Sequence, residues 1–144
     1  ADVRMQLMLG ALLTGQGTDF APPGLNSAVA HVIGGRFHLD NGLVNAILLP
    51  HTMRFNAGVT GERLRVIASA LDDHSSGPAD VVAIQAVVAL MSELGIPKGL
   101  QAAGVEADAL ETVANDVAGD WFLRQNPRPV SGPAEVLEVL KAAM

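Results

Sequence analysis

The sequence predicts an all-α protein, a bundle of about six to seven helices formed by a single domain over residues 1–144. Apolar residues recur at spacings of three and four along most of the chain, which is the period of a helix with one buried face. No stretch alternates apolar and polar residues as a half-buried strand does. A chain of this length can bury roughly two thirds of its unfolded surface in one core.

The first third of the chain is expected to hold two helices separated by a proline-rich break. Residues 2–14 carry apolar side chains on most sides, which predicts that neighbouring elements cover this helix. Residues 15–24 contain paired prolines and glycines and are expected to end it. The next helix carries His31. A loop is expected after it, in which Gly34 and Gly35 form a turn and which runs to Asn41.

The middle of the chain is expected to form two further helices with a turn between them. The first contains Pro50, whose missing backbone donor predicts a kink that reorients His51. A turn is expected at Asn56–Val59. Thr60 then has the residue type of an N-cap and would begin a helix that runs to Leu71.

Three helices are expected in the last half of the chain. Residues 79–94 form the most apolar of them, which predicts a place at the centre of the bundle, and Gly95 is expected to end it. Residues 107–123 and residues 131–144 form the other two. The loop before residue 79 contains His74, which is expected to be solvated.

Composition excludes several classes of function. The net charge of −6, with lysine and arginine scattered, argues against nucleic-acid binding, which requires a clustered basic surface. No apolar run reaches the roughly 20 residues of a membrane span, and no signal peptide is recognised. The absence of cysteine excludes disulfides and thiolate chemistry. A cytoplasmic location is the expectation that remains.

Hydrophobicity predicts association with a partner. Hydrophobic residues make up 49% of the chain and the mean hydropathy is +0.33, both high for a free monomer. Such a chain is expected to form a homo-oligomer or an obligate complex, because large exposed apolar patches mark interaction surfaces. The leucines expected in that surface belong to the first helix: Leu7, Leu9, Leu12 and Leu13.

Residues 28–56 concentrate the chemically distinctive side chains. They hold three of the four histidines, a Gly-Gly pair, an Asp-Asn-Gly sequence and the proline in the apolar run. The string AHVIGGRFHLDNGLVNAILLPHTMRFN resembles the signature of the iron-dependent alcohol dehydrogenase and maleylacetate reductase family, in the dehydroquinate synthase-like superfamily. Two later stretches, LGIPKGLQAAGVEADALETVANDVAGD and NPRPVSGPAEVLEVLKAA, resemble the closing segments of that family. The resemblance therefore covers nearly the whole chain.

The resemblance implies the C-terminal helical domain of such an enzyme, without its nucleotide-binding domain. The family transfers a hydride between a nicotinamide cofactor and an alcohol or enol substrate in a cleft between two domains. This chain is expected to use NAD or NADP only when a partner domain completes the cleft. The other expected ligand is a small alcohol, aldehyde or enol.

The sequence departs from the family at the metal site. Two histidine ligands of the family correspond to Ser27 and Asn41 here, and the earlier aspartate and histidine ligands have no counterpart. A hydroxyl must ionise to bind a metal well, and an amide oxygen is a weak neutral donor, so neither is a normal ligand of iron or zinc. No metal is therefore expected.

The catalytic candidate is His31, which the resemblance places near the nicotinamide and the substrate, and histidine is suited to moving a proton near neutral pH. The alternative is a core histidine bonded to a backbone carbonyl. Ser27 and Asn41 are expected to bind substrate by hydrogen bonds, and Asn41 is also expected to be a helix N-cap. His38 is a weaker substrate-binding candidate. His51 is expected to make a structural hydrogen bond.

Three functions are compatible with these residues. The first is the substrate-side part of a nicotinamide-dependent oxidoreductase, either a subunit that needs a partner chain or a fragment of a longer enzyme. The second is a non-catalytic scaffold or regulatory partner derived from the same family, which the lost ligands favour. The third is a metal-independent lyase or hydrolase that uses His31 with Ser27, four residues earlier on the same helix face.

Overall fold

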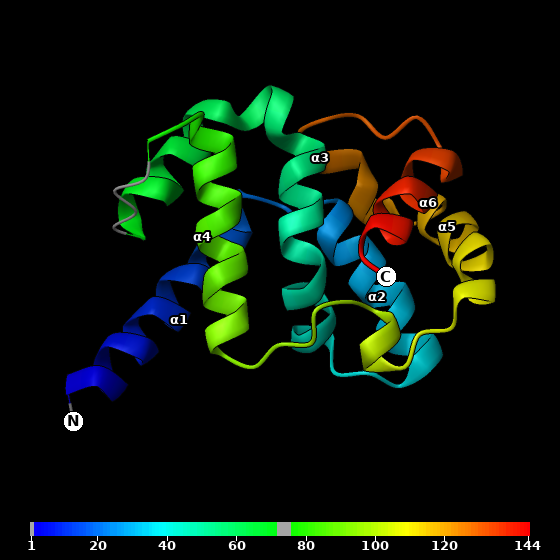
Figure 1. Cartoon of the computed structure of the whole chain (residues 1–144), viewed down its shortest axis with the longest axis horizontal. Coiled ribbons are helices and arrows are strands. Elements are labelled where there is room, and N and C mark those ends of the chain that lie inside the picture. The colour runs from blue at the N-terminus through cyan, green and yellow to red at the C-terminus, as the bar shows by residue number, and fades with distance from the viewer. Residues whose placement is uncertain (1, 72–75) are drawn as a thin grey trace.

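The structure is a computed structural model, and it describes residues 2–71 and 76–144; His74 lies outside these ranges. Within them the chain forms six α-helices and three short 3₁₀ segments and contains no strand, so the expected all-α class is confirmed (Figure 1). The elements are α1 (Asp2–Phe20), α2 (Leu25–Phe37), α3 (Asn41–Ala70), α4 (Ala79–Glu93), η1 (Gln101–Ala103), η2 (Ala107–Ala109), α5 (Leu110–Ala118), η3 (Trp121–Gln125) and α6 (Pro133–Ala142).

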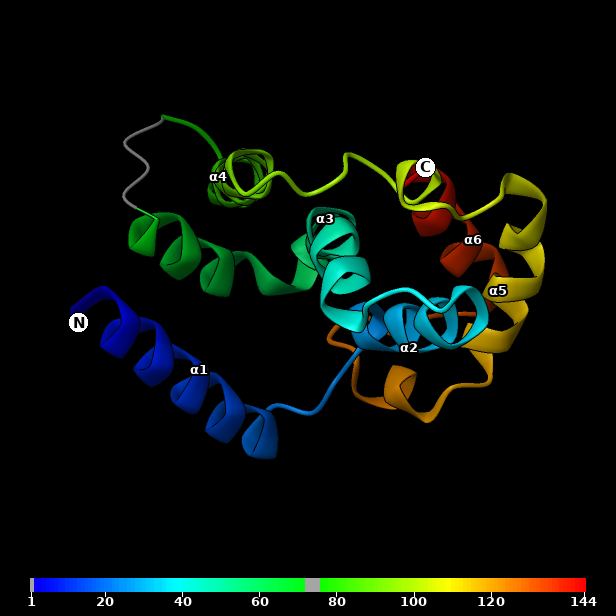
Figure 2. The same cartoon turned by 90° about the horizontal axis from the view of Figure 1, so that it is seen from below.

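The main core lies among α2, the first half of α3, α5 and α6. Figures 1 and 2 show these helices gathered on one side of the molecule, with α2 surrounded by the others. Their buried faces are built mainly from valine and leucine. The largest fully buried side chains are Leu25, Val29, Ile33, Val44, Leu48, Leu100, Val105, Val113, Val117, Val136 and Leu140.

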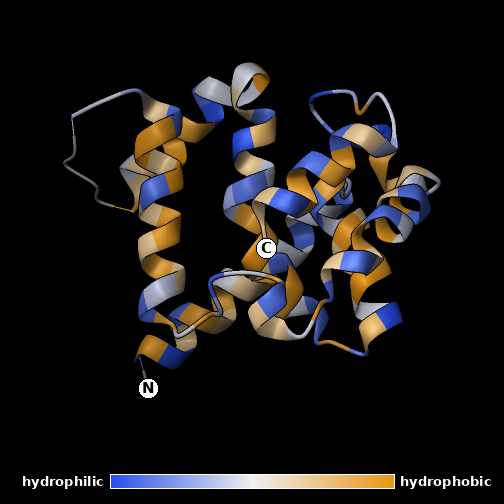
Figure 3. Cartoon of the chain, turned by 45° about the vertical axis from the view of Figure 1, so that its right-hand side comes forward, coloured by the Kyte–Doolittle hydropathy of each residue, from blue (hydrophilic) through white to orange (hydrophobic). Residues whose placement is uncertain are grey.

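Helix α4 lies at the edge of the molecule rather than at the centre of the bundle, so that expectation is wrong. It packs along α3, where Leu64 and Ala68 meet Val82 and Ala83 in a second, smaller cluster. Its other side is apolar but exposed, as Figure 3 shows by its colour. An apolar helix predicts that something covers it, but the sequence does not say which element does so.

Helix α1 extends away from the main core and has no buried residue (Figure 2). It continues to Phe20, so the expected break after Thr14 is wrong. Glycine inside a helix costs only about 1 kcal/mol, whereas proline costs about 3 kcal/mol and removes a donor. The helix therefore tolerates Gly15 and Gly17 and ends before the pair of prolines at 22 and 23.

The junction between α2 and α3 is shorter than expected. Helix α2 runs through Gly34 and Gly35, so these glycines do not form a turn. The chain reverses instead at His38, which ends α2 in the left-handed conformation (φ 54°). Asp40 rather than Asn41 caps α3, since its Oδ1 accepts a hydrogen bond from the backbone N–H of Leu43 at 2.9 Å.

Helix α3 is continuous where a turn was expected at Asn56–Val59. Thr60 does not cap a new helix; its Oγ1 donates back to the carbonyl oxygen of Asn56 at 3.0 Å. Pro50 lies inside the helix as expected. The helix nevertheless changes direction. Figure 1 shows that the green part of its ribbon leaves the axis of the upright teal part. A bend in an unbroken helix thus replaces the expected turn.

The last third of the chain follows the expected order with one difference. Gly95 (φ 71°) ends α4, and the N–H groups of Gly95 and Ile96 donate to the carbonyls of Ser92 and Met91. The helix expected over 107–123 is interrupted after Ala118, because the Asp120 carboxylate caps a separate turn, η3. Helix α6 forms as expected. No helix among the described residues has the length and apolar character needed to cross a membrane.

Candidate functional site

His31 and Asp120 form a hydrogen-bonded pair at the surface of α2. The Nδ1 atom of His31 lies 2.9 Å from Oδ2 of Asp120, whose side chain is only 7% exposed, while the imidazole is 65% exposed. The second carboxylate oxygen accepts from the backbone N–H of Phe122 at 2.9 Å. Both oxygens of Asp120 are therefore held. The alternative of a core histidine bonded to a backbone carbonyl is wrong.

This geometry fixes how His31 can exchange a proton. The Asp120 carboxylate accepts a hydrogen bond, so Nδ1 keeps its proton and the neutral ring presents an unprotonated Nε2. The ring of Phe122 lies on one side, with its centroid 5.8 Å from that of the imidazole, and Trp121 packs on Phe122 at 4.2 Å. The arrangement is an oriented, accessible base beside an aromatic surface.

Sequence reasoning missed Asp120 because it placed this residue inside a continuous helix. The pair joins positions 89 residues apart, which no local pattern reveals. One local signal was present. A glycine followed by an aspartate is typical of a helix end and a new cap, and Gly119 and Asp120 have these roles here.

The substrate-binding candidates lie on α2, on α3 and on the loop between them. Asn41 accepts from the Asn45 side chain through its backbone oxygen at 2.8 Å and through Oδ1 at 3.3 Å. Asn45 in turn accepts from Asn26 at 2.8 Å, and Asn26 is the neighbour of Ser27 on α2. Asn41 is thus connected to the start of α2 by a chain of amides.

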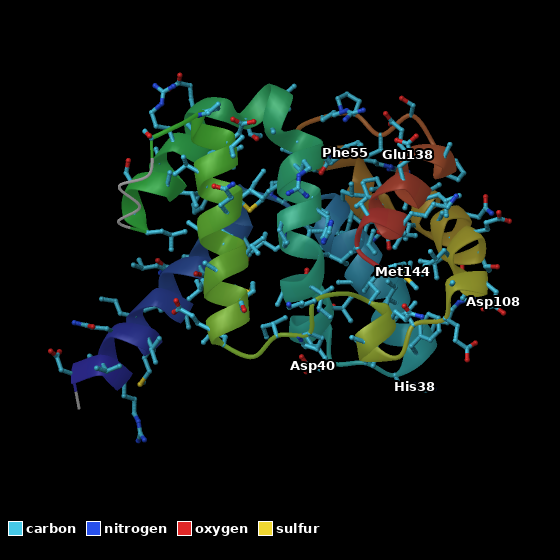
Figure 4. The ribbon with its side chains drawn as sticks, viewed as in Figure 1. His38, Asp40, Phe55, Asp108, Glu138 and Met144 are labelled. Atoms are coloured by element: carbon cyan, nitrogen blue, oxygen red, sulfur yellow. The ribbon has the colours of Figure 1, made fainter. Side chains whose placement is uncertain are left out.

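Ser27 and His38 differ in their surroundings. Ser27 is half-buried on α2. Figure 4 shows His38 with Asp40 on the loop that joins α2 to α3, at the lower end of the molecule in this view, where the histidine is exposed. The structure therefore forms two hydrogen-bonded groups, His31 with Asp120 and Asn41 with Asn45 and Asn26.

The donor set of the described chain does not fit an iron or zinc ion. Over residues 2–71 and 76–144, no three histidine, aspartate or glutamate side chains lie together in a way that could hold a metal. At the two positions where the resemblance implies ligands, Ser27 offers a hydroxyl and Asn41 an amide oxygen that already accepts a hydrogen bond. Both are poor donors for these metals.

A cavity of about 450 Å³ lies between α3 and α4 and is closed by residues 96–98. Its wall includes His51, whose Nδ1 is buried without a hydrogen-bond partner in the described part of the chain. The expected structural hydrogen bond of His51 is therefore not made at this atom. Burial lowers the pKa of His51 below its ordinary value of 6.5, and the nearby charge of Arg54 lowers it further.

The lowered pKa of His51 predicts a specific loss of stability in acid. As the pH falls, His51 of the unfolded chain takes up a proton near its ordinary pKa of 6.5, whereas the folded chain does so only at lower pH. The contribution of His51 to the free energy of unfolding is therefore present above pH 6.5 and is lost as the pH falls below it. Urea unfolding between about pH 8 and pH 5 checks this. The fall in the free energy of unfolding over this pH range should be smaller in His51→Phe than in the wild type, and the same in His38→Gln as in the wild type. The prediction would be contradicted if the free energy of unfolding changed equally with pH in all three proteins.

Comparison with known proteins shows the class to which this fold and site belong. Residues 1–144 match the model described as Fe-containing alcohol dehydrogenase family, C-terminal. The chain belongs to that family and corresponds to its C-terminal domain, as the resemblance implied.

Individual relatives agree with the family match. The chain is 35% identical over 131 residues to lactaldehyde reductase of Escherichia coli strain K12, covering 88% of this chain and 34% of the relative. It is 31% identical over 125 residues to the NAD-dependent methanol dehydrogenase of Bacillus methanolicus, covering 84% and 32%. The crystal structure of 1,3-propanediol oxidoreductase superposes with a TM-score of 0.78 at 30% identity, covering 84% and 32%. The chain thus spans about a third of the length of these proteins.

Proposed function

We propose that this chain is the substrate-side helical domain of a nicotinamide-dependent alcohol oxidoreductase. It would act together with a nucleotide-binding domain, on the same polypeptide or on a partner chain. The observation that carries the proposal is the family match over all 144 residues. The names of two relatives, lactaldehyde reductase and NAD-dependent methanol dehydrogenase, support a small alcohol or aldehyde as the substrate.

The chemistry divides between the cofactor and this domain. NAD or NADP, held by the completing domain, would supply the hydride acceptor for the carbinol carbon in oxidation and the hydride donor in reduction. For a carbonyl group to form, the proton on the hydroxyl oxygen of the same carbon must also leave. His31 takes it at Nε2 while Asp120 holds the ring and stabilises the imidazolium that forms. Ser27, Asn41 and His38 are proposed to hydrogen-bond the substrate, and no metal takes part.

Two other functions have observations in their favour. A scaffold or regulatory partner is favoured by the replacement of two family ligands by Ser27 and Asn41. A hydrolase gains an acidic third member in Asp120, but the hydrogen bonds of the described residues include none from Ser27 to His31. A nucleophile needs that contact with its base. The oxidoreductase therefore remains the best-supported function.

The experiment that tests this function is alcohol-dependent reduction of NAD and NADP. It is measured on the protein that joins this domain to its nucleotide-binding domain, with propane-1,2-diol, methanol and other short alcohols as substrates. This chain alone is the control and should neither turn over nor bind NADH, because a pyrophosphate site needs a strand, a glycine-rich turn and a helix N-terminus. A joined protein that binds NADH but oxidises no alcohol would favour the scaffold.

We further propose that α1 is covered by another element in the working protein. Leu7, Leu9, Leu12 and Leu13 are each more than half exposed, at 70%, 54%, 58% and 59%. Burying each such side chain is worth roughly 1.5–3 kcal/mol, so leaving all of them in water would be costly. The expected result is a homo-oligomer or a stable complex that the double substitution of Leu9 and Leu13 by aspartate dissociates.

Light scattering over a dilution series measures this association. Gln6→Asp, which adds one negative charge at an exposed polar position of the same helix, is the matched control and should leave the assembly intact. A monomer in all three proteins would contradict the prediction.

A further inference from the structure

The cavity between α3 and α4 is outside the groups assigned to the oxidoreductase site. His31, Ser27, His38 and Asn41 do not line it. Its volume of about 450 Å³ is within the range of roughly 300–1,000 Å³ that is usual for small-molecule sites. One part of the wall is apolar, with Ile47, Pro50, Val88 and Met91. The shape and lining are those of a site for a small molecule with an apolar part.

The polar part of the wall is basic. Arg54 comes from α3 and Lys98 from the segment after α4, so tertiary packing brings these two cations to one cavity. Among the residues that the structure describes, no aspartate or glutamate lines it. The ion pairs of the described residues include neither cation, although the chain carries a net charge of −6. Two cations that have no carboxylate partner among the described residues make the potential at this wall more positive.

His51 is part of the same wall, and one of its ring nitrogens is buried. Its Nδ1 has no partner among the described residues, and a buried polar atom without a hydrogen bond is rare in native structures. Desolvation lowers the pKa of this imidazole, so the ring is neutral near pH 7 and can place its single proton on Nδ1. Because this buried atom has almost no accessible surface, it does not face the cavity, and His51 contributes an uncharged ring to the wall rather than a donor.

We propose that this cavity binds a small organic anion, a carboxylate with a short apolar tail. The carboxylate would lie between Arg54 and Lys98. The tail would lie along Pro50, Val88 and Met91. Arginine and lysine bind carboxylates through charge-assisted hydrogen bonds, and the apolar wall contributes in proportion to the tail area that it buries. This site is independent of the proposed oxidoreductase function.

NMR titration of the whole chain tests the site with three matched probes. Hexanoate has both the charge and the tail, 1-hexanol has the tail alone, and acetate has the charge alone. Hexanoate should saturate and shift the amide signals of residues 46–54, 88–92 and 96–98. Acetate and 1-hexanol should bind at least about tenfold more weakly, since each lacks one of the two contributions.

Substitutions then locate the carboxylate. Arg54→Gln and Lys98→Gln should each weaken hexanoate binding about tenfold and leave 1-hexanol binding unchanged, because a hydrogen bond to a charged group is lost. Arg124→Gln and Lys141→Gln remove the same charges elsewhere and should have no effect. All four side chains are exposed, so the amide spectrum of each free variant should match that of the wild type.

The proposal is overturned if hexanoate shifts signals mainly outside the cavity, or if it shifts none at millimolar concentration. It is also overturned if 1-hexanol binds as tightly as hexanoate, which would mean that the cavity selects only an apolar tail. Equal weakening by the cavity variants and by their controls would show a response to net charge and would also overturn it.

Discussion

Replacing His31 with glutamine is expected to lower kcat for alcohol oxidation by about 10²–10⁴-fold, the usual contribution of a general acid or base. Glutamine can still donate a hydrogen bond to Asp120, so the loss would come from the missing proton exchange rather than from misfolding. The measurement is the steady-state rate of nicotinamide reduction across pH, on the protein that joins this domain to its nucleotide-binding domain. The wild-type profile should show an ionisation that the variant lacks.

Two further variants separate chemistry from surface charge. Asp120→Asn should lower kcat less than His31→Gln, since Asp120 acts by holding the imidazole. Arg36→Gln breaks the exposed ion pair between Arg36 on α2 and Asp116 on α5, and should leave kcat unchanged. A His31→Gln enzyme with the wild-type rate at every pH would show that His31 does not accept the hydroxyl proton.

Replacing Asn126 with alanine is expected to lower the free energy of unfolding by about 2–4 kcal/mol. This side chain is 9% exposed. Its Oδ1 accepts from the N–H of Leu25, the first residue of α2, at 3.0 Å, and its Nδ2 donates to Oδ1 of Asn56 and to the oxygen of Arg128 at 2.8 and 2.6 Å. Alanine leaves the buried donor of Leu25 and the partly buried acceptor of Arg128 without these partners.

Urea unfolding followed by circular dichroism measures this loss. The matched control is Asn115→Ala on α5, where the side chain is exposed and donates to the carbonyl of Glu111 in the same helix at 2.8 Å. It should cost less than about 1 kcal/mol. Similar losses in the two variants would show that Asn126 does not join α2, α3 and the loop before α6 in the way described.

The sequence predicted the helices better than their ends and their places. Apolar periodicity located α2, α4 and α6 because burying one face is what stabilises each of them. It failed at Gly34 and Gly35, because the chain reversal is made by His38 in a left-handed conformation that histidine seldom adopts. It also placed α4 at the centre, because an apolar helix looks the same whether this chain or another element covers it.

The candidate site was predictable only in its local part. His31 followed from the family resemblance, which concerns residues close together in the chain. Asp120 could not be found in that way, since its contact with His31 depends on how η3 packs beside α2. The basic cavity was missed for the same reason: Arg54 and Lys98 share a wall only after the segment that follows α4 packs against α3.

The proposed mechanism requires that His31 supports the reaction without a metal. The most direct test is to measure alcohol-dependent nicotinamide reduction before and after a chelator removes transition metals. The protein that joins this domain to its nucleotide-binding domain should contain no stoichiometric iron or zinc by elemental analysis, and it should keep its rate after chelation. The reason is that Ser27 and Asn41 supply only neutral donors, which hold these metals weakly. A rate that is lost on chelation and restored by Fe²⁺ or Zn²⁺, and that Ser27→Ala or Asn41→Ala abolishes, would contradict it.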